Sequence, residues 1–144
     1  MPTIRRFEDL NVWQSSRELV KIVYGYTNQG AFQKDFALRD QIRRSVVSVM
    51  SNIAEGFGAG SDAEFIRFLG YARRSLCETQ SQLYIALDLE YISKKDFDSV
   101  YQKTNVTEKQ INAFIGYLAK YKTVRIVREE SAPYEINIDE SIDL

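Results

Sequence analysis

Five polar side chains recur at steps of four, three, four and three residues along an otherwise apolar segment: Gln41, Ser45, Ser48, Asn52 and Glu55. Because an α-helix turns once every 3.6 residues, this spacing places them on one narrow stripe. Small hydroxyl and amide side chains on a buried stripe suit hydrogen bonding between closely packed helices. We therefore predict a structural polar network that comprises Gln41, Ser48, Asn52, Glu55, Ser75 and Glu78.

A glycine-rich turn near residue 59 is expected to fold this segment back on the next one. Two residues that face each other across the turn then have residue numbers that add up to about 118. Gln41 then lies opposite Glu78. We predict that Glu78 is partly buried and is held by Gln41 and by Arg43 or Arg44, because a buried carboxylate without partners costs several kcal/mol. The alternative is an ordinary solvated glutamate.

Histidine is absent, and Cys77 is the single cysteine. This composition excludes histidine-dependent catalysis, the usual zinc sites and an intrachain disulfide, and it fits a reducing compartment. The glutamates Glu55, Glu64 and Glu78 lack the partners that di-metal sites in helical bundles use, so we predict no metal site. We also predict no catalytic residue, no cofactor and no enzymatic activity, and we expect Cys77 to be a small buried core residue.

Basic residues form two clusters in the sequence. The fold-back pairing puts Arg43-Arg44 and Arg73-Arg74 at one level, and a second cluster near residues 120–128 is interleaved with Tyr117 and Tyr121. Arginine binds phosphate in a bidentate manner, and tyrosine stacks on bases. The alternative is that these cations pair with acids or lie in a subunit interface. The predicted nucleic-acid-binding residues are Arg43, Arg44, Arg73, Arg74, Lys120, Lys122, Arg125 and Arg128.

Four segments with helical periodicity must position these side chains. The apolar spacing predicts helices over about 9–28, 35–54, 61–91 and 93–121, and Ser61 and Ser93 are the expected N-caps of the last two. A weak stretch at 104–107 is a candidate kink. Short links between long helices favour antiparallel neighbours. We therefore predict an all-α fold, an antiparallel up-down-up-down four-helix bundle.

Charge divides the chain into two parts. Residues 1–128 are predicted to be a single bundle domain with 19 basic and 14 acidic residues, a net charge of +5. Residues 129–144 hold the other six acids and no base, a net charge of −6. This acidic C-terminal tail is either disordered or an extended segment that docks on a neighbouring surface. We expect it to compete with RNA for the basic surface.

The apolar residues bear on location and assembly. They make up 44% of the chain, too many for a disordered protein, and no run reaches the ~18 residues that cross a bilayer. We therefore expect a soluble cytoplasmic protein without a membrane partner. Several of the nine tyrosines, Tyr117 among them, fall outside the four core stripes. Since exposed aromatic residues mark association surfaces, we expect a homo-oligomer.

Several motifs carry a family resemblance over residues 7–121. They are Phe7-x-x-Leu10-x-Val12-Trp13, Gln41-x-Arg43-Arg44, Asn52-Ile53-Ala54-Glu55-Gly56, Ser61-x-x-Glu64-Phe65-x-x-Phe68-Leu69 and Ala72-x-x-Ser75-Leu76-x-Glu78. Together they resemble the bacterial four helix bundle protein family, also called 23S rRNA-intervening-sequence or S23-type proteins. The resemblance implies a ring-shaped homopentamer with no known catalysis, similar to the accessory variability determinant of diversity-generating retroelements. That protein is a basic pentamer that binds nucleic acid and a reverse transcriptase. Arg74 stands where the family commonly has glycine, and Ala59 where it commonly has a basic residue.

Two functions of different classes follow from these observations. The first is a non-enzymatic oligomeric bundle that binds structured RNA, such as rRNA, or a ribonucleoprotein through its arginine clusters, with salt-dependent and weakly sequence-specific affinity. The alternative is a protein-interaction scaffold, a homo-oligomeric ring without a nucleic-acid role. An enzymatic function would be supported only by the polar stripe.

Overall fold

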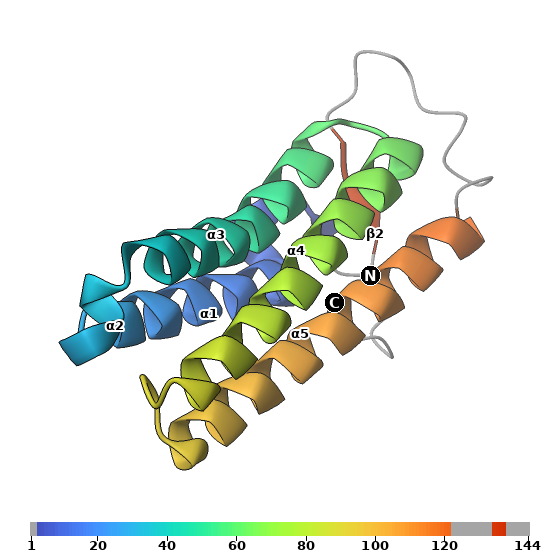
Figure 1. Ribbon diagram of the computed structural model, residues 1–144. Helices are drawn as coiled ribbons and strands as arrows, with labels where there is room; N and C mark the ends of the chain where they lie inside the picture. Colours follow the sequence, from blue (N-terminus) through green and yellow to red (C-terminus); the bar gives the residue numbers. More distant parts are fainter. Residues whose placement is uncertain (1–2, 122–133, 138–144) are drawn as a thin grey trace.

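Four long antiparallel helices form the bundle, as predicted (Figure 1). The computed structural model describes residues 3–121 and 134–137. The long helices are α1 (Asn11–Thr27), α3 (Phe36–Gly58), α4 (Asp62–Asp88) and α5 (Lys94–Tyr121). The structure adds elements that were not predicted: a 3₁₀ turn at Phe7–Asp9, the short helix α2 (Gly30–Lys34), and a two-stranded antiparallel sheet of β1 (Thr3–Ile4) and β2 (Ile136–Asn137). Among the described residues, no helix is both long enough and apolar enough to cross a membrane.

Polar side chains begin three of the long helices. The Ser61 hydroxyl accepts from the backbone N–H of Glu64 at 3.2 Å, and Ser93 accepts from Asp96 at 3.0 Å, which confirms both predicted N-caps. Asp35 caps α3 in the same way. α5 is unbroken through residues 104–107, the weak stretch of the sequence. Its buried threonines donate to carbonyls one turn earlier, so their hydroxyls are satisfied without breaking the helix.

Gly56 lies inside α3, which continues to Gly58, four residues beyond the predicted end. A Cβ at Gly56 would lie 2.8 Å from Cβ of Phe68 and 2.9 Å from Cδ1 of Phe65, so only glycine allows α4 to approach α3 this closely. The turn falls later, at Gly60, whose φ of +80° suits glycine. In three hydrogen-bonded pairs across α3 and α4, Ser45–Thr79, Ser48–Ser75 and Gln41–Gln82, the residue numbers add up to 123 or 124 instead of about 118, so the predicted register is shifted by about five residues.

Substituting Gly56 tests this close approach. We expect Gly56→Ala to lower the free energy of unfolding by about 1–2 kcal/mol, because overpacking outweighs the gain in helix propensity. The matched control is Gly70→Ala in the interior of α4, where an added Cβ meets nothing within 4 Å. That variant should gain about 0.4–1 kcal/mol. Urea unfolding followed by circular dichroism measures both, and a gain in stability for Gly56→Ala would contradict the packing described.

Residues 134–137 of the predicted tail are extended and docked on the bundle. Ile136 is fully buried and pairs with Ile4 in the sheet, and the Tyr134 hydroxyl donates to Oδ1 of Asp62 at 2.5 Å. Tyr117, expected on the surface, is buried instead, and its hydroxyl donates to the carbonyl of Asn137. The rest of the tail lies outside the described residues.

Candidate anion-binding site

The polar stripe of α3 faces a matching stripe on α4. The Ser45 hydroxyl lies 2.8 Å from the Thr79 hydroxyl and 2.8 Å from Oε1 of Gln82. Ser48 accepts from Ser75 at 2.9 Å and from Nδ2 of Asn52 at 2.9 Å. These hydrogen bonds link α3 to α4. Thr79 and Gln82 were missed, although Ser75, Thr79 and Gln82 repeat the four-and-three spacing that identified the stripe on α3.

The two glutamates assigned to this network do not belong to its interior. Glu55 is exposed, and Glu78 is exposed and accepts a hydrogen bond from Gln82 at 3.3 Å. The shifted register places Gln82 opposite Gln41, with 3.4 Å between Nε2 and Oε1. The prediction of a buried Glu78 held by Gln41 and an arginine was therefore wrong. Cys77 is exposed as well, so the prediction of a small buried core residue was wrong.

The arginine pairs do not form one cluster. The register shift moves Arg73-Arg74 toward the level of residues 49–50, about 9 Å along α3 from Arg43-Arg44. Arg73 also turns toward α5, where it donates to Oδ1 of Asn112 at 3.0 Å. Lys120 is exposed on the last turn of α5. The other predicted members of its cluster, Lys122, Arg125 and Arg128, lie outside the described residues.

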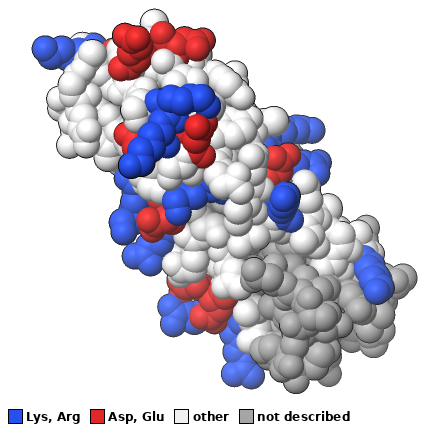
Figure 2. All heavy atoms as spheres, turned by 90° about the horizontal axis from the view of Figure 1, so that it is seen from below, with Lys and Arg blue, Asp and Glu red and all other residues white. Residues whose placement is uncertain are grey.

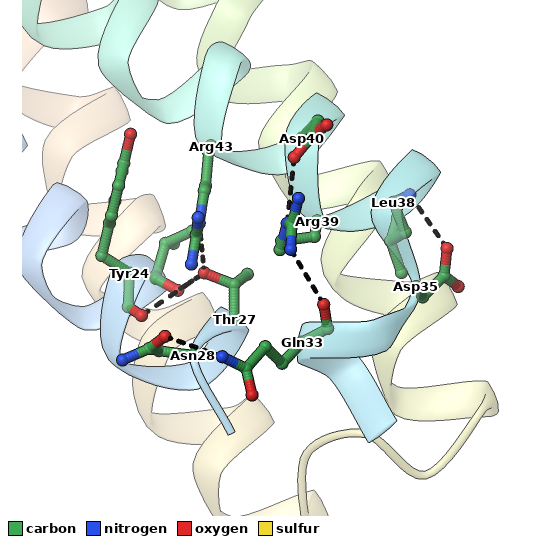
Figure 3. A network of polar contacts seen from close by, with 10 residues as sticks. Tyr24, Thr27, Asn28, Gln33, Asp35, Leu38, Arg39, Asp40 and Arg43 are labelled. Atoms are coloured by element: carbon green, nitrogen blue, oxygen red, sulfur yellow. Dashed lines mark hydrogen bonds and ion pairs between the residues drawn. The ribbon is translucent and has the colours of Figure 1, made fainter. Parts of the chain in front are cut away.

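Arg43 is held in place by two residues of α1. Its guanidinium carbon lies 4.6 Å from the centre of the Tyr24 ring, and its Nε donates to the Thr27 hydroxyl at 2.7 Å (Figure 3). Thr27 is fully buried and donates in turn to the carbonyl of Val23, so its hydroxyl oxygen is fixed to accept from Arg43. Stacking and hydrogen bonding together orient the guanidinium before any ligand arrives.

Arg43 and Arg44 share a shallow pocket of about 340 Å³ between α1 and α3, which Tyr24, Asp40 and Val47 complete. The carboxylate of Asp40 is engaged by Arg39, whose Nε lies 3.0 Å from Oδ1 (Figure 3). No ion pair within residues 3–121 and 134–137 includes Arg43 or Arg44. Two guanidinium groups beside a 43% exposed tyrosine ring are suited to bind a phosphate and to stack a base.

A second group of arginines lies along α4. The guanidinium of Arg67 is 5.8 Å from the centre of the Tyr71 ring, and that of Arg74 is 5.9 Å from it. Nη2 of Arg67 also lies 2.8 Å from Oε2 of Glu64, and this ion pair weakens the attraction of Arg67 for an anionic ligand. Sequence reasoning missed Arg67, although positions 67, 71 and 74 share one helix face. Figure 2 shows basic side chains on both sides of the molecule with acidic ones between them, and no continuous basic face in that view.

Among the described residues, shifted pKa values belong to groups outside the pocket. The hydrogen bond to Glu8 raises the pKa of Arg6. The hydrogen bond from the Tyr91 hydroxyl to Asp35 raises the pKa of Tyr91, and burial raises the pKa of Tyr26 and Tyr101. These hydroxyls therefore stay protonated at neutral pH and add no general base. Within the described residues, no group of three histidine, cysteine or acidic side chains gathers as metal ligands do.

Comparisons with known proteins agree with this architecture. The sequence profile of a family described as "23S rRNA-intervening sequence protein" matches residues 8–113. The chain is similar to the crystal structure of a protein with unknown function from the S23 ribosomal protein family of Bacteroides thetaiotaomicron, with 32% sequence identity and a TM-score of 0.65. That match covers 72% of this chain and 97% of the other. Among functionally curated proteins, none matches. The chain therefore belongs to the 23S rRNA-intervening sequence protein family.

Proposed function

We propose that this protein is a non-enzymatic helical bundle that binds structured RNA through phosphate contacts centred on Arg43 and Arg44. The observation that carries the proposal is the pair of guanidinium groups in one open pocket without an ion-pair partner among the described residues. The family description refers to 23S rRNA, which makes RNA the polyanion to test first. Neither the family nor its solved member carries an enzymatic description.

The pocket geometry supports a definite binding mode. Arg43 is already oriented by Tyr24 and Thr27, so little side-chain entropy is lost when it grips a phosphate. Arg44 adds a second guanidinium from the next residue of α3. The exposed ring of Tyr24 offers a stacking platform for an unpaired base beside that phosphate. The arginines on α4 and the basic end of α5 extend the proposed contact area.

Fluorescence anisotropy with a labelled RNA hairpin tests this function. We expect log K to fall linearly with log salt, with a slope of about −0.7 to −0.9 for each phosphate contacted. Hairpins of different loop sequence should bind with similar affinity, because phosphate contacts carry no sequence information. Failure to bind any hairpin at the lowest salt concentration, with circular dichroism showing a folded bundle, would contradict the proposal.

A protein-interaction scaffold is the second candidate. Exposed large apolar side chains favour it, with Phe36 at 64%, Leu89 at 51% and Tyr84 at 48% exposure. Such residues are used in protein contacts more than in phosphate contacts. A homo-oligomeric ring, a pentamer by resemblance to the family, would bury some of them. Light scattering with and without RNA separates the candidates, since only the RNA-binding bundle gains mass from the hairpin.

A further inference from the structure

The end of the bundle at the α3–α4 turn carries a surface that holds an extended peptide segment (Figure 1). Residues 134–137 occupy it through strand pairing with β1 and through two side chains. Ile136 is fully buried. The Tyr134 ring packs edge-on against Phe57 and Phe65, with ring centres 5.5 and 6.2 Å apart. This is the mode in which a strand edge gives affinity and pockets for alternate side chains give specificity.

Each position of the segment meets a matching group. The buried carboxylate of Asp62 accepts from the Tyr134 hydroxyl, and an aromatic floor lies beneath the ring. The side chain of Glu135 points the other way, where Nε of Arg5 lies 3.2 Å from its Oε1. The carbonyl of Asn137 accepts from Tyr117. The surface therefore selects an aromatic residue at position 134 and an aliphatic residue at position 136, while Glu135 and Asn137 add polar contacts at its rim.

These contacts do not depend on the covalent link to α5. The contacts named above are made with residues 3–5, 57–65 and 117, all of which belong to the bundle and its N-terminal strand. Twelve residues, 122–133, join the segment to α5. A chain of that length spans up to about 40 Å, whereas two packed helices are roughly 20 Å across. The link is therefore long enough for the segment to extend beyond its own bundle.

We propose that this surface binds the C-terminal segment of a second copy of the chain, so that neighbouring molecules are linked by exchange of residues 134–137. Exchange of identical elements keeps every contact of the closed molecule and adds a connection between copies at little cost. A second copy is favoured over an unrelated partner because each copy carries the sequence that the surface fits at all four positions. The proposal does not depend on RNA binding.

Cysteine pairing distinguishes exchange from closure within one chain. Thr3 and Asn137 are directly opposed in the antiparallel pair, with 3.0 Å between their side-chain oxygens. Opposed positions of this kind lie within disulfide range. Full-length Thr3→Cys and Asn137→Cys chains are prepared separately with Cys77→Ser, since Cys77 is exposed. They are then mixed and oxidised. We expect a covalent dimer in the mixture, with a 3–137 disulfide identified by peptide mass mapping, and no such linkage in either chain alone.

Two controls make the outcome decisive. Adding Ile136→Asp to the Asn137→Cys chain should abolish the dimer, whereas the matched change Val106→Asp, at a 45% exposed valine of α5, should leave it. A chain carrying both cysteines shows whether residues 134–137 pair with β1 of the same chain. If it forms only an internal bridge while the mixture stays uncross-linked, the segment is an internal clasp and the proposal is overturned. If neither the internal nor the intermolecular disulfide forms, the strand pairing itself is overturned, and the proposal with it.

Discussion

Replacing Phe65 by alanine is expected to lower the free energy of unfolding by about 3–5 kcal/mol. Phe65 is fully buried where α3, α4 and α5 meet. Its ring packs edge-on against Phe114 at 4.9 Å and Phe57 at 6.0 Å between centres, and it fills the space left by the missing side chain of Gly56. Removing the ring costs its transfer free energy and leaves a cavity that rigid helices cannot close.

Urea unfolding followed by the fluorescence of Trp13 measures this loss. The matched control is Phe36→Ala, which removes the same side chain from a site that is 64% exposed and touched by Arg39. That variant should change stability by no more than about 0.5 kcal/mol. Because Phe65 also supports Tyr134, its replacement should release residues 134–137 as well. Equal effects for the two variants would contradict the core described.

The helices could be predicted from the sequence because their apolar periodicity and their serine caps are local signals. Ser61 and Ser93 begin α4 and α5 as predicted, and the apolar stripes identify the helix faces that form the core. The register between α3 and α4 is not local. It depends on whether Gly56 ends a helix or allows two helices to approach closely, and the sequence pattern is the same for both. The misplacement of Glu78 and the separation of the arginine pairs both follow from that one choice.

The candidate site was predicted in part for the same reason. Arg43 and Arg44 were identified by residue type, since adjacent arginines are conspicuous in any sequence. Their orientation depends on Tyr24 and Thr27, which are 19 and 16 residues earlier and reach Arg43 only because α1 and α3 pack together. The docked segment shows the opposite case. The sequence left two alternatives for the tail, a disordered one and an extended, docked one, and nothing in the sequence indicated β1 as the partner of residues 136–137.

Removing the two pocket charges is expected to have the largest effect on RNA binding. The variant Arg43→Gln with Arg44→Gln should bind a hairpin at least about tenfold more weakly at moderate salt, since each charged hydrogen bond contributes about 1.5–3 kcal/mol. The slope of log K against log salt should become less negative by about 1.4–1.8 as two phosphate contacts are lost. Neither side chain is in the hydrophobic core. The loss of the hydrogen bond from Arg43 to Thr27 should lower the free energy of unfolding by only about 1 kcal/mol, so the bundle stays folded.

A control with the same loss of charge separates the pocket from the overall field of the molecule. Lys94→Gln with Lys95→Gln removes two exposed cations at the start of α5, and it should weaken binding slightly with nearly the same slope. Thr27→Val removes the hydrogen bond that orients Arg43 and changes no charge. If RNA binds in the pocket, this variant keeps the salt slope and loses affinity, because Arg43 must then be ordered by the ligand. Equal losses in the two charge variants would show that the bundle attracts RNA without a defined site.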